Sequence, residues 1–351
     1  MISKSIKVFI LCIIIPHAVI SQVDHTGKVK TLMSEADKEA SEGWTHGGGI
    51  GLDLGQFLII NPRVGAGDNR LGFGGAISYF AKYRKDKLAW DSFSSYNFGV
   101  QRLGSGVIPG LEAKIPFQKS IDEFRLSSKV GYKVRESSKF FYAFDLAFIS
   151  QFIGTYRGTD GKNYIKEVKN PDPDGFRTNL VSKFLNPASL TLSTGIDFKP
   201  NDNYSIFFSP LSIKAIIITN ENIAQLGVHG NKLKDETNPG LGYKKTDWQL
   251  GGTLKAHYSG QLFNEQLGWN SSLIFYSNYL RNPQNVDLDW TNEFVFMIFK
   301  GIAVSVWTNI YYDDDILVNI SDQSFPGGVT DQLGKRVSFT EQLLLKYIKT
   351  F

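Results

Sequence analysis

The sequence predicts an all-β protein, a transmembrane antiparallel up-and-down β-barrel of about twelve strands with a short N-terminal helical or mobile lead-in. Apolar and polar residues alternate along most of the chain from Trp44 onward. The alternating segments are about 13–17 residues long, whereas strands of soluble sheets average about 5–6 residues. A tilted membrane strand needs about 9–11 residues, so segment length favours the barrel.

Composition excludes two other classes of protein. The chain has 351 residues, of which 42% are hydrophobic, 13% aromatic and 21% charged. A disordered chain would hold fewer aromatic residues and more charge. No run of about 18 apolar residues occurs, which excludes a polytopic helical membrane protein. The formal net charge is +4, or +2 without Lys4 and Lys7 of the predicted signal peptide, and this near-neutral balance points to no particular polyanionic partner such as nucleic acid.

Residues 1–21 are predicted to be a cleaved signal peptide. Lys4 and Lys7 form a positive region, and an apolar core follows over residues 8–15. The alternative is an N-terminal anchor, but the apolar run is about half the length of a spanning helix. We expect cleavage after Ser21 and therefore export to the outer membrane of a Gram-negative cell.

Cleavage would remove Cys12, so we expect no disulfide in the mature chain. Residues 22–43 have apolar residues at roughly helical spacing among charged ones. This segment is a periplasmic lead-in or a plug helix that enters the barrel, as some barrels are plugged by a helix. Residues 44–351 are assigned to the barrel itself.

Twelve segments show the alternation of a half-apolar strand. In 286–298 the even positions are all apolar except Asn292, and the odd positions carry Asp287, Asp289 and Glu293. The predicted strands are 44–58, 70–84, 88–103, 121–135, 140–155, 187–199, 203–218, 244–259, 265–281, 285–299, 302–313 and 337–351.

Short and long connections alternate between these strands, as in bacterial outer-membrane barrels. With the N-terminus in the periplasm, the short turns are periplasmic and the long loops extracellular. The exception is 282–284, a short connection where a long one is expected. The longest loop, 156–186, either folds over the mouth of the barrel, constricts it, or is a variable surface loop.

Aromatic residues recur at the predicted periplasmic strand ends, on the apolar face. Amphipathic rings prefer the headgroup region, so this pattern predicts an aromatic girdle. The alternative is that aromatic residues simply favour strands. The ten residues are Trp44, Tyr83, Trp90, Tyr132, Tyr142, Phe198, Tyr204, Tyr258, Trp269 and Tyr347. The chain ends on Phe351, and a terminal aromatic on an amphipathic last strand resembles the recognition signal of the barrel-assembly machinery.

Several blocks of sequence resemble an uncharacterised, Bacteroidetes-type outer-membrane β-barrel family that is grouped as a domain of unknown function. The blocks are WTHGG (44–48), FLNPASLTL (184–192), DFKPNDNYSIFFSPL (197–211), SNYLRNPQNVDLDW (277–290) and YYDDDI (311–316). Residues 61–70 depart from the family's first loop, where a Trp and a Gly-Gly pair are expected. The resemblance implies a barrel in the outer membrane and implies no activity.

If the apolar face meets lipid, the other face lines the lumen and carries two groups of charges. The basic group, near the periplasmic end, comprises Lys82, Arg84, Lys129, Lys133 and Arg135, with Asp91 among them. The acidic group, mostly in the outer half, comprises Asp287, Asp289, Glu293 and Asp313. One interpretation is a transverse field that selects solutes, and the other is a lumen filled by salt bridges.

No cofactor, metal or catalytic site is predicted. The run Asp313–Asp315 lacks the spacing and glycine of a calcium loop, so we expect a solvated turn rather than a cation site. His229 and His257 have no partners with the spacing of a metal site or a catalytic triad. An outer-membrane hydrolase is therefore the weakest of three hypotheses.

The leading hypothesis is a porin-like transport protein, a small channel for polar solutes with a charged lumen. The second is a closed scaffold barrel that binds an unknown protein partner through its long extracellular loops. Both predict outer-membrane lipids and the barrel-assembly machinery as partners.

Overall fold

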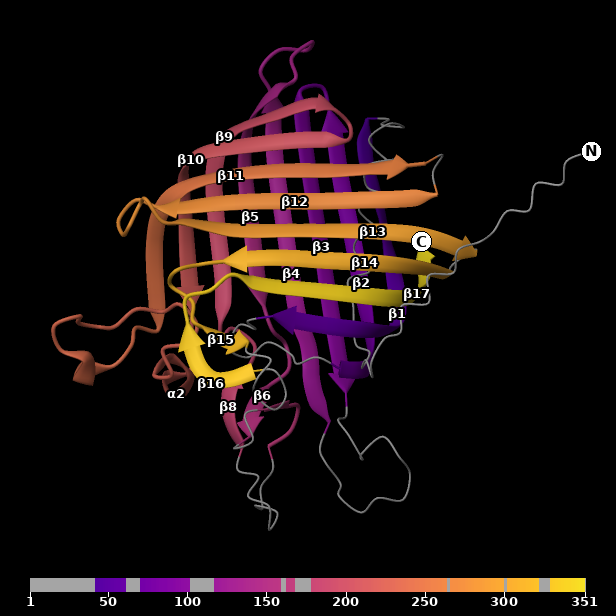
Figure 1. Ribbon diagram of the computed structural model, residues 1–351. Helices are drawn as coiled ribbons and strands as arrows, with labels where there is room; N and C mark the ends of the chain where they lie inside the picture. The colour runs from indigo at the N-terminus through magenta and orange to yellow at the C-terminus, as the bar shows by residue number, and fades with distance from the viewer. Residues whose placement is uncertain are drawn as a thin grey trace, which may run out of the picture.

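The computed structural model describes residues 42–60, 70–101, 117–158, 162–167, 178–263, 266–299, 302–321 and 329–350, and these are almost entirely antiparallel strands (Figure 1). The predicted signal peptide over 1–21 lies outside the described residues. So do Phe351 and nearly all of the lead-in predicted over 22–43.

Each of the twelve predicted segments holds one long strand. Their bounds are β1 Gly43–Ile60, β2 Arg70–Lys85, β3 Leu88–Gln101, β4 Gln118–Lys133, β5 Phe140–Ser150, β9 Ala188–Asn201, β10 Tyr204–Ile217, β11 Thr246–Leu262, β12 Leu267–Asn278, β13 Val286–Phe299, β14 Ile302–Tyr312 and β17 Ser338–Thr350. The clearest boundary difference is β5, which ends at Ser150 rather than at residue 155.

The long strands pair antiparallel with their neighbours in the chain, and β5 pairs with β9. β1 pairs with both β2 and β17, β17 also pairs with β14, and β3 pairs with both β2 and β4. Each of the twelve long strands therefore has a hydrogen-bonded strand on either side. We call the end of the strands with the short connections the turn end and the opposite end the loop end.

Some of the long connections contain regular structure that the sequence does not predict. The connection between β5 and β9 holds β6 Thr155–Gly158, β7 Asn163–Tyr164 and β8 Thr178–Ser182, which join the main sheet. β15 Val318–Ser321 and β16 Val329–Gly334 form a separate two-stranded sheet between β14 and β17. The helical turns α2 Glu221–Ala224 and η2 Pro239–Leu241 lie between β10 and β11. All of these elements gather at the loop end (Figure 1).

The two faces of the long strands are the reverse of those in a soluble protein. Large apolar side chains are exposed, with Phe73 at 69%, Leu52 at 63% and Trp248 at 62%. Charged side chains are buried, with Lys82 at 3% and Asp197 at 1%. Lys and Asp are almost never fully buried in soluble proteins unless they are paired. The strands therefore enclose a polar interior and present an apolar outer face.

A β-bulge in β10 shapes one part of this interior. The register of β10 shifts between Ser209 and Ser212, and both side chains are buried. Their hydroxyls lie 3.0 Å apart, and Ser212 also hydrogen-bonds to the hydroxyls of Ser193 and Thr253 at 2.8 Å. Gly195 on β9 is required here, because a Cβ at that position would lie 2.0 Å from the carbonyl oxygen of Phe208.

In the part of the chain that the structure describes, no helix is long and apolar enough to cross a membrane.

Candidate functional site

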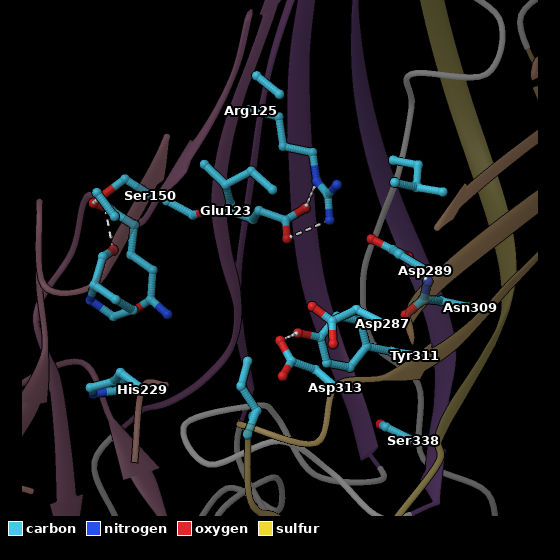
Figure 2. Close-up of a pocket in the computed structure, with 18 of the residues that line it drawn as sticks. Glu123, Arg125, Ser150, His229, Asp287, Asp289, Asn309, Tyr311, Asp313 and Ser338 are labelled. Carbon is cyan, nitrogen blue, oxygen red and sulfur yellow. Dashed lines mark hydrogen bonds and ion pairs between the residues drawn. The ribbon is translucent and has the colours of Figure 1, made fainter. Parts of the chain in front are cut away.

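A cavity of about 420 Å³ opens inside the sheet toward the loop end (Figure 2). Its walls come from strands far apart in the sequence, including β4, β5, β10, β12, β13, β14 and β17. The loop between β10 and β11 contributes His229, and the segment after β14 contributes Ile316. Figure 2 shows Asp287, Asp289 and Asp313 on one side and Ser150 and His229 on the other.

Three residues of the predicted acidic group line this cavity. Asp287 and Asp289 project from β13, and Asp313 follows β14 directly. Asp289 accepts a hydrogen bond of 2.6 Å from the Nδ2 of Asn309. Glu293, the fourth residue, is buried further along β13. The acidic group therefore lies on one wall, and its three residues nearest the loop end line the cavity.

Lys214 on β10 provides the positive charge for this wall. Its Nζ lies 3.5 Å from Asp287 and 3.6 Å from Asp313. The same Nζ lies 5.1 Å from the centre of the Tyr276 ring, which adds a cation–π contact. Since β11 and β12 separate β10 from β13, these ion pairs cross the interior rather than follow the sheet.

The run Asp313–Asp315 is not the solvated turn that the sequence predicts. Asp313 and Asp314 are buried, because Lys214 approaches the first and the side chain of Asn285 donates to the second at 2.9 Å. Lys232 forms an ion pair with Asp315. Oxygens of Asp287, Asp313 and Asp314 lie within 4.8 Å of one another, a spacing that suits a hard cation. The ammonium of Lys214 already supplies a positive charge at this position.

The wall formed by β4 carries paired charges. Arg125 donates two hydrogen bonds to the carboxylate of Glu123, at 2.6 and 2.9 Å, and the pair lies in the cavity (Figure 2). Near the loop end of β4, Lys119 forms a buried ion pair of 2.7 Å with Asp122 and donates 2.8 Å to the carbonyl oxygen of Ile153. The charged side chains of this wall of the cavity are therefore paired with one another within β4.

The predicted basic group lies at the turn end, below the cavity. Lys82 on β2 and Lys129 on β4 stand opposite Asp91 on β3 in the strand register. Arg84 forms an ion pair of 2.6 Å with the same carboxylate. Lys133 lies over the ring of Phe141, with 5.9 Å between its Nζ and the ring centre. Lys82, Arg84 and Lys129 are thus brought together around the Asp91 position, and Lys133 lies at the same end of β4.

Arg135 does not belong to this group. β4 ends at Lys133, and residues 134–139 form the connection to β5, where the carbonyl oxygen of Arg135 accepts a hydrogen bond from the Ser138 amide. The Arg135 side chain is exposed. The prediction was wrong here because it extended the alternation of β4 two residues too far.

The sequence reasoning missed several charged residues of the interior. Asp197 and Lys199 on β9 join the basic group through ion pairs of 3.3 Å with Lys129 and Asp91, respectively. Lys255 on β11 forms an ion pair with Asp145 on β5. The predicted separation of charge across the interior is therefore reduced by local pairing. Alternation alone would have placed these side chains inward. It could not have shown which of them lie at the same level along the strands and therefore meet.

The ten predicted girdle residues all lie at the turn end, and none of them is buried. Several contact one another across neighbouring strands. The ring of Trp44 lies 5.1 Å from Tyr83 and 5.4 Å from Trp90, and the ring of Tyr258 lies 4.7 Å from both Tyr204 and Trp269. These contacts form two aromatic clusters on the outer face.

The loop between β10 and β11 packs over the cavity. Ile218, Ile223 and Ala224 form a small apolar cluster with Ile216 at the end of β10. Hydrogen bonds from Lys245, Gln225 and Lys234 lower the pKa of Glu221 to about 2. Burial lowers the pKa of His229, whose Nε2 lies 2.8 Å from the carbonyl oxygen of Val181 in β8. His229 therefore joins this loop to the adjacent loop at the cavity wall.

Residues 60–156 match the model of a family described as a protein of unknown function (DUF3078). This segment is therefore similar to the DUF3078 family. The match confirms the resemblance to an uncharacterised family, although all five blocks quoted for it lie outside the matched residues and only the departing segment 61–70 lies inside them. The matched segment includes β2 to β5 and all five residues of the predicted basic group. The bacterial group implied by the resemblance stays a prediction.

A search of curated proteins found no match to this chain. Among solved structures, the COG4313 outer membrane channel from Pseudomonas putida F1 is similar at 10% identity and a TM-score of 0.39, covering 89% of this chain and 97% of the channel. The translocator domain of autotransporter NalP from Neisseria meningitidis has 7% identity and a TM-score of 0.35, covering 92% and 99%. The NanC porin has 6% identity and a TM-score of 0.37, covering 84% and 98%.

Proposed function

We propose that the twelve long strands close into a β-barrel in an outer membrane and that its interior passes small polar solutes. The reversed burial carries this proposal, because an exposed apolar face and a buried charged face fit a barrel with lipid outside and a polar lumen inside. The pairing of β1 with β17 and of β3 with β4 supports closure. A closed barrel leaves no sheet edge unpaired in lipid.

In this arrangement the short turns are periplasmic and the cavity opens toward the cell exterior. The signal peptide predicted over 1–21 would direct export, and Phe351 would be read by the barrel-assembly machinery. The aromatic clusters at the turn end would lie at the inner interface of the outer membrane. A solute entering from outside would meet the acidic wall of the cavity first and the basic group afterwards.

Cysteine pairing tests closure of the barrel. Leu52 on β1 and Tyr347 on β17 are paired residues in the register and are both exposed on the outer face. A Leu52→Cys, Tyr347→Cys variant should cross-link within one chain under oxidising conditions. Leu52→Cys with Leu211→Cys on the outer face of β10 is the control and should not cross-link within one chain. The reverse pattern would contradict a closed barrel.

Planar-bilayer recording tests the pore. Purified protein should give discrete conductance steps, and proteoliposomes containing it should take up small polar solutes. An absence of steps at any voltage, with protein shown to be inserted, would reject the pore. Mature protein in the soluble periplasmic fraction without detergent would reject the membrane assignment itself.

The ion pairs across the interior favour a second function, the closed scaffold. Lys199–Asp91 and Lys255–Asp145 each join strands that are not neighbours, so the lumen is narrow at this level. Such a barrel would present the loop-end elements to a protein partner without passing solutes. The bilayer recording separates this function from the first.

A further inference from the structure

Three neutral polar groups in the cavity lack hydrogen-bond partners. Among the described residues, no partner is found for the Oδ1 of Asn97, the hydroxyl of Tyr276 or the Nε1 of Trp307, and all three atoms are buried. Asn97 is 2% exposed and Tyr276 is 6% exposed. A buried polar group without a partner costs about 1–3 kcal/mol. Three such groups in one cavity therefore indicate that something else satisfies them.

The three groups come from different walls and line the same space. Asn97 projects from β3, Tyr276 from β12 and Trp307 from β14, and each lines the cavity. Ser95 and Ser305 lie two positions deeper on β3 and β14, and their buried hydroxyls also lack partners among the described residues. The unsatisfied groups thus continue from the cavity into the interior on two walls.

The charged groups of the cavity have partners already. Arg125 makes two hydrogen bonds with Glu123, Lys119 pairs with Asp122, and Lys214 serves the acidic wall. A charged ligand would have to compete with these pairs, and breaking a buried pair is costly. The unmet hydrogen-bonding capacity is therefore neutral and includes both donors and acceptors.

We propose that the loop-end cavity binds a small uncharged polyhydroxylated solute, a monosaccharide or a polyol, through Asn97, Tyr276 and Trp307. A hydroxyl can donate to the Asn97 Oδ1, accept from the Trp307 Nε1, and do either with the Tyr276 hydroxyl. The ring of Trp307 lines the cavity and offers apolar surface to the C–H groups of a sugar. The volume of about 420 Å³ lies in the range of small-molecule sites.

This inference names the solute class for the proposed channel, and equilibrium binding tests it. Calorimetry with the full-length protein in detergent should detect D-glucose or mannitol binding more tightly than D-glucuronate or D-glucosamine, which have similar size and carry charge. Tyr276→Phe and Trp307→Phe should each weaken the binding of the neutral sugar about three- to tenfold, the loss of one hydrogen bond.

The matched control is Tyr79→Phe, which removes a hydroxyl from the outer face, where Tyr79 is 44% exposed. It should leave sugar affinity unchanged. Without sugar, Tyr276→Phe should melt at the same temperature as the wild type or higher, since it deletes an unsatisfied group. A lower melting temperature for Tyr276→Phe with unchanged affinity would assign it a structural role and overturn the proposal.

Failure of the channel and failure of the inference give different results. If no conductance is found but neutral sugars bind and the two variants weaken them, the pore fails and the inference stands. If conductance is found but neutral sugars neither bind nor reduce the current from the loop side, the inference fails and the pore stands. Equal affinity for charged and neutral sugars would also overturn the inference.

Discussion

The Nζ of Lys199 on β9 lies 3.3 Å from the carboxylate of Asp91 on β3, although β4 and β5 separate the two strands. An ion pair between strands that are not neighbours must cross the interior. Asp91 also receives a hydrogen bond from Arg84 and stands opposite Lys82 and Lys129. This carboxylate therefore offsets part of the positive charge of the basic group.

Neutralising Asp91 should shift ion selectivity toward anions. Asp91→Asn keeps the side-chain shape and removes one negative charge from the basic group. A unit charge about 6 Å from an ion in water contributes about 0.7 kcal/mol, with opposite sign for chloride and potassium, so the ratio of chloride to potassium permeability should rise about tenfold. The reversal potential in a salt gradient across a planar bilayer measures this ratio.

Asp86→Asn is the control for this change. Asp86 lies in the exposed turn between β2 and β3 with a φ of 50°, a conformation that Asn also adopts readily. Its substitution should leave the reversal potential unchanged. If Asp91→Asn behaves like Asp86→Asn, the ions do not pass through the basic group, and the proposed route through the lumen is wrong.

Lys214 should be the residue whose loss most destabilises the cavity. Lys214→Met retains the aliphatic stem but leaves Asp287 and Asp313 without their shared positive charge. Removing one partner of a buried ion pair costs about 3 kcal/mol. Urea unfolding in detergent should show this loss, and Lys214→Met combined with Asp287→Asn should recover part of it.

Calcium should rescue the Lys214→Met variant but not stabilise the wild type. Without the ammonium, the oxygens of Asp287, Asp313 and Asp314 lie within 4.8 Å of one another, a spacing that Ca²⁺ can bridge. Millimolar CaCl₂ should therefore raise the melting temperature of the variant. A rise of equal size in wild-type protein would mean that the wild type already binds the ion, contrary to the arrangement around Lys214.

The fold follows from the sequence because the alternation has the same physical cause in every long strand. Each long strand has one face toward apolar surroundings and one toward a polar interior. Apolar and polar residues therefore alternate along its whole length, as in 286–298. The small strands β6 to β8 and β15 to β16 were missed because loops pack on loops there. Their pairing is set by contacts that no local pattern records.

For the charged residues of the site, the sequence could predict only whether each side chain faces inward or outward. Alternation directs Asp287 and Lys129 inward, and both are found there. It does not give strand stagger, so it could not show that Lys214 reaches Asp287 or that Asp197 reaches Lys129. The heights of inward residues depend on the register of all intervening strands. Opposite charges far apart in the chain therefore looked unpaired.

Brominated lipids should distinguish the outer and inner faces. Trp248 is 62% exposed on the outer face, whereas Trp307 lines the cavity. In variants that retain one of these tryptophans, with the other five replaced by Phe, lipids brominated on their acyl chains should quench Trp248 and leave Trp307 bright. Quenching of Trp307 as strong as that of Trp248 would reverse the assignment of the two faces.

Acid should destabilise the folded protein through His229, in the loop between β10 and β11. Burial lowers its pKa, so the folded protein holds the imidazole neutral while the unfolded chain takes up a proton at about pH 6.5. The contribution to stability is complete above that pH and is lost as the pH falls toward the folded pKa, with a slope of at most about 1.4 kcal/mol per pH unit. Thermal unfolding at pH 8 and pH 5 should show a larger drop in melting temperature for wild type than for His229→Gln. His46→Gln, at an exposed position of β1, should keep the wild-type drop. An equal drop in wild type and His229→Gln would show that other groups govern the acid response.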